Sequence, residues 1–297
     1  MWIKSIKWYC LCALLPWLPL QAASPADSLV ILFTGNNSGQ ITDCGCGEDP
    51  AGGLLRLATA VDSLRRIYPS AILLDSGDWL TSYRNINQDR LVLHALRKIS
   101  FDALAIGEYE LPHSKPYLSP LFEELQLPLV LTDFPPVPHS HKQMILRRSG
   151  WNVRIVSFLE PALIQRRVNG PVAWHHESFI RAIQTAVRPA RQHPELLIAV
   201  FHQLNDLSPN ILKLLPENSL IIRGHWHRQF DPETDGFRQV AGRYVVNPGD
   251  NGEFLGMAIF DLEKKHWSVY FIRLNRAVPE DPALAAWLKN RSSKLQE

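Results

Sequence analysis

The sequence predicts an α/β protein. Short apolar runs alternate with segments in which apolar residues recur every three or four positions, as expected for strands followed by helices. From residue 237 onward the pattern changes to strands without helices. Polar side chains follow several of the apolar runs where each run ends. Because ligands bind beyond the carboxyl ends of strands in open α/β sheets, we expect a functional site at that edge.

The first 23 residues have the layout of a secretory signal peptide and are excluded from the fold. Lys4 and Lys7 precede an apolar stretch over residues 8–20, and Ala22 and Ala23 follow it. The stretch is short for a transmembrane helix, and two prolines interrupt it. We therefore expect an exported, periplasmic protein with no stable membrane insertion after cleavage. An uncleaved N-terminal anchor is the alternative.

Charge and composition argue against nucleic acid as the main partner. The chain has 31 Lys and Arg residues against 29 Asp and Glu residues, and removal of Lys4 and Lys7 leaves 29 of each. A mature chain without net charge lacks the basic surface that a polyanion requires. Residues 24–297 contain no low-complexity linker and no internal repeat, so we expect them to form a single domain.

Apolar runs bounded by glycine, proline and polar residues define the predicted strands, and periodic segments define the helices. A proline-rich loop follows the run that ends at Ile106. The last helix begins at the capping residue Asp281, with Pro282 in its first turn. The predicted strands cover residues 29–33, 71–74, 103–106, 129–131, 153–158, 196–201, 220–223, 243–247, 255–261 and 267–274. The predicted helices cover residues 54–64, 89–99, 178–191 and 281–294.

The segment Leu-Ile-Ile-Arg-Gly-His-Trp-His at residues 220–227 contains a candidate metal-binding pair. Its apolar residues are typical of a strand buried on both faces, and Gly224 ends the strand so that His225 and His227 leave one turn together. Neutral imidazole is the commonest side-chain ligand for transition metals, and a His-x-His pair on extended backbone can direct both rings toward neighbouring ions. The alternative is a pair of exposed loop histidines.

Further candidate ligands follow other predicted strands. Asn36, Asp78 and Glu108 lie just past the first three strands, and His202 lies at the end of the strand over residues 196–201. Each has a simpler explanation alone: Asp78 as a helix cap, Glu108 as a surface acid and His202 as a core histidine. Their common position favours one shared site. Carboxylate and imidazole ligands suit Zn, Mn or Fe, and such an ion would support hydrolysis of a phosphate ester.

These residues belong to motifs with a recognisable order. Thr-Gly-Asn-Asn-Ser-Gly occupies residues 34–39, Gly-Asp 77–78, Gly-Glu-Tyr-Glu 107–110 and Gly-His-Trp-His 224–227, and Gly-Gly-Leu-Leu-Arg occupies 52–56. In this order and spacing the chain resembles the calcineurin-like metallophosphoesterases, specifically the N-terminal catalytic domain of 5'-nucleotidases. The resemblance implies a four-layer αββα sandwich of two mixed sheets, a divalent metal cofactor and a small phosphorylated substrate. It does not cover the second domain with which 5'-nucleotidases recognise the nucleoside, so it implies no nucleotide specificity.

Four motif positions depart from the family pattern. Asn36 replaces an Asp, Ser38 and Tyr109 replace histidines, and Glu108 replaces an Asn. Tyr109 stands where the family has its proton donor, and a phenol of pKa near 10 is a poor acid or base at neutral pH. The resemblance implies catalytic positions at His202, Tyr109 and Asn36.

The same comparison implies one complete metal site and one incomplete site. The complete site has two carboxylates and two imidazoles, from Asp78, Glu108, His202 and His225. The incomplete site retains Asp78 and His227, with Asn36 as a neutral oxygen donor. We therefore expect one bound ion, and a second only where further ligands are present.

Cys44 and Cys46 are candidates for those further ligands. They lie in the loop that leads from Asn36 to the Gly-Gly-Leu-Leu-Arg segment. Thiolates are strong soft ligands, and the flanking glycines allow both sulfurs to face one ion. A redox pair is a second interpretation, although a Cys-x-Cys disulfide ring is small and strained. Two thiols without a role are the third.

The sequence therefore predicts an exported, metal-dependent phosphoesterase-like protein. The competing hypothesis is a catalytically degenerate member of the family that serves as a metal-binding or thiol redox module. The replacement of the proton-donor histidine by Tyr109 favours this second hypothesis.

Overall fold

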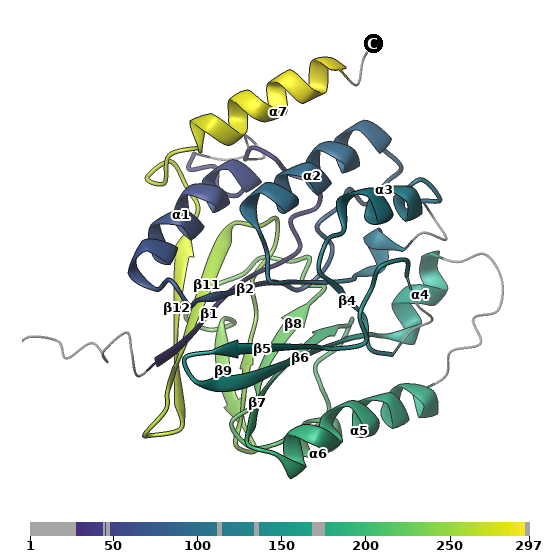
Figure 1. Cartoon of the computed structure of the whole chain (residues 1–297), viewed down its shortest axis with the longest axis vertical. Helices are drawn as coiled ribbons and strands as arrows, with labels where there is room; N and C mark the ends of the chain where they lie inside the picture. The colour runs from purple at the N-terminus through teal and green to yellow at the C-terminus, as the bar shows by residue number, and fades with distance from the viewer. Residues whose placement is uncertain are drawn as a thin grey trace, which may run out of the picture.

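A computed structural model describes residues 28–43, 45, 48–111, 115–133, 137–167 and 176–294. Two six-stranded sheets pack face to face in this part of the chain, and helices cover both outer faces (Figure 1). The elements follow in the order β1 (Ser28–Thr34), α1 (Leu54–Ile67), β2 (Ile72–Asp75), α2 (Ile86–Ile99), β3 (Ala103–Ala105), the 3-10 turn η2 (Glu108–Glu110), α3 (Leu118–Leu125), β4 (Leu129–Val130), β5 (Met144–Arg148), β6 (Trp151–Leu159), α4 (Pro161–Arg167), α5 (His176–Gln192), β7 (Glu195–His202), α6 (Pro209–Leu214), β8 (Leu220–Gly224), β9 (Phe237–Val240), β10 (Arg243–Val246), β11 (Phe254–Asp261), β12 (His266–Arg273) and α7 (Pro282–Lys294).

Both sheets are mixed. In the first, with order β12-β11-β1-β2-β3-β4, strands β1 to β4 are parallel and β11 runs antiparallel to β1 and β12. In the second, with order β5-β6-β7-β8-β10-β9, the four inner strands are parallel and the two edge strands antiparallel. The register pairs Thr34 with Asp75 and His202 with Gly224. The loops that follow neighbouring parallel strands therefore begin next to one another at the same edge of each sheet.

Three apolar cores separate the four layers. One lies between the first sheet and helices α1, α2, α3 and α7, one between the two sheets, and one between the second sheet and helices α5 and α6 (Figure 1). Strand β7 shows the alternation, because Ile198 and Val200 face the other sheet while Ala199 and Phe201 face α5. His202 has the parity of Val200 and so belongs to the face between the sheets. A one-residue slip would move every side chain to the wrong face.

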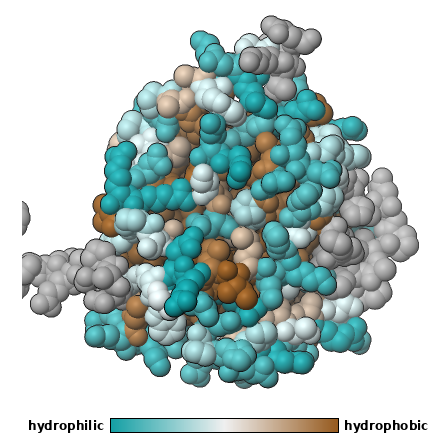
Figure 2. All heavy atoms as spheres, in the orientation of Figure 1, coloured by the Kyte–Doolittle hydropathy of each residue, from teal (hydrophilic) through white to brown (hydrophobic). Residues whose placement is uncertain are grey.

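Helix α7 packs across α1 and α2 at the outer surface. Leu284 and Leu288 join the core beneath it. Trp287 contacts the His94 ring of α2 edge-on, with ring centroids 5.7 Å apart, and the Lys98 ammonium lies 5.0 Å from its centroid. Elsewhere the surface in Figure 2 is mainly hydrophilic, and hydrophobic side chains form only small patches on this face.

The predicted α/β class and the four-layer sandwich of two mixed sheets are confirmed. Helices α3, α4 and α6 and the strands β5 and β9 were not predicted. Helices α4 and α6 begin with Pro161 and Pro209, which a helix accepts in its first turn because that N–H has no intrahelical partner. Edge strand β5 is never fully buried, so it lacks the apolar run that marks the inner strands.

The predicted signal segment lies within residues 1–27, outside the described residues. The prediction of a single domain over residues 24–297 stays a prediction. Among the helices of the described ranges, none is both long and apolar enough to cross a membrane.

Candidate metal centre

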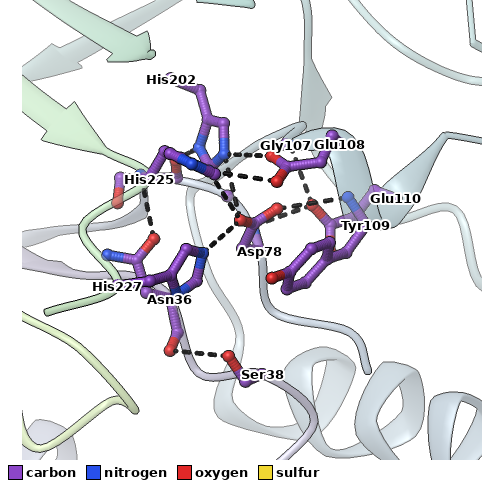
Figure 3. Close-up of polar contacts among 12 residues, drawn as sticks. Asn36, Ser38, Asp78, Gly107, Glu108, Tyr109, Glu110, His202, His225 and His227 are labelled. Carbon is purple, nitrogen blue, oxygen red and sulfur yellow. Dashed lines mark hydrogen bonds and ion pairs between the residues drawn. The ribbon is translucent and has the colours of Figure 1, made fainter. Parts of the chain in front are cut away.

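Loops from both sheets bring carboxylates and imidazoles to one point (Figure 3). Asp78 and Glu108 follow β2 and β3 of the first sheet, whereas three histidines come from the ends of β7 and β8 in the second. One ligand atom from each of Asp78, Glu108, His225 and His227 lies within 4.8 Å of the others. The fifth residue, His202, contacts both carboxylates.

The Asp78 carboxylate lies at the centre of the group. Its Oδ2 atom is 2.9 Å from His227 Nε2, 3.2 Å from His202 Nε2 and 3.5 Å from His225 Nδ1. Its Oδ1 atom accepts a hydrogen bond from the backbone N–H of Tyr109 at 3.2 Å. Asp78 is fully buried, so these contacts replace the water that an ionised carboxylate requires.

Glu108 contacts two histidines, one with each of its carboxylate oxygens. Its Oε2 atom is 2.8 Å from His202 Nε2, and its Oε1 atom is 3.1 Å from His225 Nδ1. Metal bonds of about 2.1 Å place neighbouring ligands about 3.0 Å apart in an octahedron and about 3.4 Å apart in a tetrahedron. The separations of 2.8–3.5 Å between the carboxylate oxygens and the imidazole nitrogens match those spacings. The four side chains therefore fit a divalent ion.

Hydrogen bonds on the far side of two rings determine which nitrogen faces the cluster. His202 donates from Nδ1 to the Ser76 carbonyl at 2.8 Å, because a carbonyl only accepts, and so directs Nε2 to the carboxylates. His227 contacts Asp250 through Nδ1 at 3.1 Å. His225 Nδ1 is buried and has no hydrogen-bond partner among the described residues, although Glu108 lies beside it. An unpaired nitrogen at this position is a suitable metal ligand.

Opposite charges compensate one another within the group. Burial opposes ionisation of Asp78, but the charge of His202 and the close contacts with all three histidines hold its pKa well below the usual range. Burial and the charge of Asp78 oppose ionisation of Glu108, but contacts with His202 and His225 keep its pKa below the ordinary value. Burial disfavours protonated His227, yet its two carboxylate partners raise its pKa to about 9. Metal binding would displace protons from such rings.

Four site residues have left-handed backbone conformations. The φ angles are 52° at Asn36 and Ser38, and 57° at Asp78 and His225. This region is unfavourable for residues other than glycine, although Asn, Asp and His tolerate it best. Such strain collects at functional sites, where surrounding contacts hold the backbone in place.

Asn36 connects three loops through its side chain. Its Nδ2 donates to the Gly249 carbonyl at 2.7 Å, and its Oδ1 accepts the backbone N–H of His225 at 3.0 Å. Ser38 Oγ lies 3.4 Å from the Asn36 carbonyl (Figure 3). Both ends of the amide are thus already bonded. The predicted role of Asn36 as a metal or catalytic ligand stays a prediction.

Tyr109 covers one side of the group. Its ring stacks on His227 at a centroid distance of 5.6 Å and an interplanar angle of 20°, and the Arg167 guanidinium carbon lies 4.6 Å from its centroid. Burial and the charges of Asp78 and Glu108 raise the pKa of the phenol. Tyr109 therefore stays protonated at neutral pH, where it can donate a hydrogen bond but is a weak acid.

Cys44 and Cys46 lie outside the described residues, so their predicted ligand role stays a prediction. The neighbouring Asp43 is anchored to Arg56 of α1 at 2.5 Å and accepts the backbone N–H of Gly45 at 2.9 Å. This part of the loop is thereby attached to the helix that begins at the Gly-Gly-Leu-Leu-Arg segment.

Two residues that support the site were not singled out by sequence reasoning. Glu110 is fully buried and accepts backbone N–H groups from Asp78, Leu80 and Gly107 at 2.8–2.9 Å, which ties the loop after β2 to that after β3. Asp250 holds His227 from a turn-rich segment. Glu110 had a detectable signal, since it lies two residues after Glu108 in the same motif. Asp250 had none, because its contact is formed only by folding.

Two glycines allow these loops to approach closely. A Cβ atom on Gly107 would meet the Asp78 side chain, and one on Gly224 would meet the Ser76 carbonyl and the His202 ring. A side chain at either glycine would therefore push the neighbouring loop away from His202.

The amino-acid sequence is similar to those of curated 5'-nucleotidases. The chain is 34% identical over 281 residues to the 5'-nucleotidase of Bos taurus, which covers 82% of the chain and 48% of that protein. It is 24% identical to the 5'-nucleotidase of Mus musculus over 98% of the chain and 57% of that protein. The chain thus spans about half the length of these curated relatives. No protein-family model matches it.

Solved structures share the fold. The sulfate thiohydrolase SoxB of Thermus thermophilus superposes with a TM-score of 0.73 at 16% identity, over 90% of this chain and 61% of that one. The calcineurin-like phosphoesterase YfkN of Bacillus subtilis superposes with a TM-score of 0.66 at 16% identity, over 90% and 97%. The chain therefore has the fold of these phosphoesterase-like structures, and it carries a carboxylate–histidine group that could hold a metal ion. In sequence the chain resembles the N-terminal domain of 5'-nucleotidases, with several substitutions in the motifs that carry the resemblance.

Proposed function

We propose that the chain is an exported hydrolase of small phosphoric esters that uses one divalent ion held by Asp78, Glu108, His202 and His225. The observation that carries this proposal is the contact of Asp78 Oδ2 with three imidazole nitrogens within 3.5 Å, while Glu108 contacts two of the same rings. A divalent ion bound there would stabilise charge on phosphoryl oxygens and lower the pKa of a bound water to about 7. The relatives are named 5'-nucleotidases, which makes nucleotides the first substrates to test.

The surrounding residues have separate tasks in this proposal. The Ser76 carbonyl accepts a hydrogen bond from His202 Nδ1, which would orient the Nε2 atom of this ring toward the ion. His227 lies between Asp78 and Asp250 and would hold a proton at Nε2 close to the reacting phosphate when it is not a ligand. Tyr109 stacks on this ring and excludes water from one side.

Metal analysis tests the proposal directly. Purified protein is expected to contain close to one transition ion per chain, and His225→Ala should lose most of it. His193→Ala alters an exposed histidine and serves as the matched control. The metal content is read by elemental analysis, and hydrolysis is followed with bis(p-nitrophenyl) phosphate and nucleoside monophosphates. Metal-free natural protein, or unchanged metal content in His225→Ala, would refute the site.

A second candidate function is metal binding with little or no catalysis. The observation that favours it is the engagement of both ends of the Asn36 amide, which leaves Asp78 and His227 as the remaining candidate ligands of a second ion among the described residues. Without a second ion, the clamp on the attacking and leaving oxygens is incomplete. The combined change Asn36→Asp, Ser38→His and Tyr109→His should then raise hydrolysis. Strong hydrolysis by the natural protein, lost in Asp78→Asn, would exclude this candidate.

Export is part of the proposal and has its own test. The positively charged start, the apolar stretch and the two alanines of residues 1–23 support it. N-terminal sequencing of protein recovered from the periplasm of an expression host should find a chain that begins close to residue 24. A chain that retains Met1 and stays with the membrane fraction would contradict it.

A further inference from the structure

Two adjoining cavities open beside the candidate metal centre. One, of about 510 Å³, is lined by His225 and His227, and the other has a volume of about 250 Å³. The two share part of their lining, namely Asp206, Arg223, Trp226 and Arg228. Trp226 stands between His225 and His227 in the sequence, so the shared wall begins one residue from the proposed metal ligands.

The shared wall is a layer of two arginines around one tryptophan. The Arg228 guanidinium carbon lies 3.7 Å from the Trp226 ring centroid, and that of Arg223 lies 4.9 Å from it. Stacking holds each guanidinium plane in place while its N–H groups stay free to bind. Arg223 pairs with Asp206, which also binds Arg238 at 3.0 Å. The one acid in this wall is therefore already shared between two cations.

Arg228 differs from the other arginines of the cavities. It is exposed, and it has no hydrogen bond or ion pair with any residue of the described ranges. Its contact with Trp226 positions the side chain without using its donors. The guanidinium therefore presents a bidentate fork at the mouth of the cavity that contains His225 and His227.

Three buried donors in the smaller cavity lack acceptors. Arg223 Nε, Trp226 Nε1 and Asn247 Nδ2 have no partner in the described part of the chain, and their residues are at most 6% exposed. All three residues line the 250 Å³ cavity. The side chains that carry these donors make this wall polar and rich in hydrogen-bond donors.

We propose that Arg228, stacked on Trp226 and backed by Arg223, binds a second phosphate group of the substrate beside the one at the metal centre. This inference rests on the proposed function and specifies its substrate class: phosphoric esters that carry another phosphate close to the reacting one. Three features favour phosphate as the ligand. The guanidinium of Arg228 can donate two parallel hydrogen bonds, the shared wall has two arginines and one acid, and the proposed metal ligand His225 and its neighbour His227 line the same cavity. Arg228 is in this role a substrate-positioning residue.

Calorimetric titration with inorganic pyrophosphate and orthophosphate tests the inference on manganese-loaded full-length protein. Orthophosphate has only one phosphoryl group, so it should depend on the metal centre alone. Arg228→Gln is expected to weaken pyrophosphate binding by about tenfold or more, which corresponds to loss of a charged bidentate contact, and orthophosphate binding by less than about twofold. Arg181→Gln is the matched control, because Arg181 is an exposed arginine of α5 that lines neither cavity.

The outcomes separate this inference from the proposed function. Equal pyrophosphate affinity of Arg228→Gln and the natural protein would overturn the inference, as would a natural protein that binds no pyrophosphate. Hydrolysis of bis(p-nitrophenyl) phosphate is measured on the same preparations. Absence of hydrolysis together with binding that depends on Arg228 would refute the proposed hydrolase and leave the phosphate site in place.

Discussion

Individual side chains in this protein organise the site through partners on other loops. Glu110 makes no contact with the proposed metal position, yet it accepts three backbone N–H groups from the loops that carry Asp78 and Glu108. Burial, together with the charge of Asp78, raises its pKa to about 8. His202 likewise depends on the Ser76 carbonyl for its orientation. Removal of such a partner should therefore affect residues that it never touches.

Glu110→Gln is predicted to destabilise the fold and weaken metal binding. The amide keeps the shape of the carboxyl group but turns a donor toward the backbone N–H groups, which leaves buried donors unpaired at a cost of about 1–3 kcal/mol. Urea unfolding gives the free-energy change. Glu177→Gln, on an exposed side chain of α5, should change stability by less than about 0.5 kcal/mol. Equal stability of the two variants would show that Glu110 is not required.

The thiols of Cys44 and Cys46 are predicted to react with iodoacetamide slowly until a chelator removes the ion, because a metal-bound thiolate is protected. The double change to Ser should lower metal content and keep the fold. Labelling that is fast with and without metal would argue against the ligand role. Labelling that responds to a reductant instead of a chelator would indicate the redox pair.

At the scale of elements, helix α7 packs on the outer face through contacts of its own with α2. The α2–α7 contact depends on Trp287, which packs on His94 and Lys98. Burial, together with the nearby positive charge of Arg291, lowers the pKa of His94 to about 4. The ring is therefore neutral in the folded protein throughout the range in which an unfolded chain would protonate it.

His94→Gln is predicted to reduce the acid sensitivity of folding. The pKa is about 6.5 when unfolded and about 4 when folded, so the unfolded chain binds more protons as pH falls between these values. Stability from the neutral ring is complete above pH 6.5 and is lost toward pH 4. The loss of unfolding free energy between pH 7 and 4.5 should be smaller in the variant by about 1–2 kcal/mol, allowing for partial solvation. Urea unfolding at both values measures it, and identical losses would contradict the assignment.

At the scale of the whole molecule, the site connects the two sheets. Its carboxylates come from loops of the first sheet and its imidazoles from loops of the second, so an ion would add a direct link between layers that already meet through an apolar core and through hydrogen bonds between their loops. Metal binding and global stability should therefore be coupled, because a ligand that binds only the native state stabilises it.

Chelation is predicted to lower the thermal midpoint of the whole molecule. An ion at 100 times its dissociation constant contributes about 2.7 kcal/mol, or about 5–10 °C for a protein of this size. Differential scanning calorimetry with and without chelator measures the shift. His225→Ala should start at a lower midpoint and respond little to the chelator. An equal response in both proteins would show that the chelator acts elsewhere.

The sequence by itself determined the fold class and the positions of the proposed ligands. Inner strands such as β1 and β7 are apolar on both faces, a pattern that follows directly from burial between layers. Asp78, Glu108, His202, His225 and His227 all follow such strands, and parallel strands bring their carboxyl ends to one edge. These relations are local or repetitive, so a single chain displays them.

Only the tertiary structure decided how the side chains are used. It engaged the Asn36 amide with Gly249 and His225, and it placed Asp250 behind His227. The residues in these contacts are separated by as many as 213 positions in the sequence, and no local propensity encodes them. The same holds for the stacking of Arg228 on Trp226 and for the donor-rich wall beside it. A hydrogen bond or a cavity wall depends on the distance between atoms, and that distance exists only after the sheets have packed.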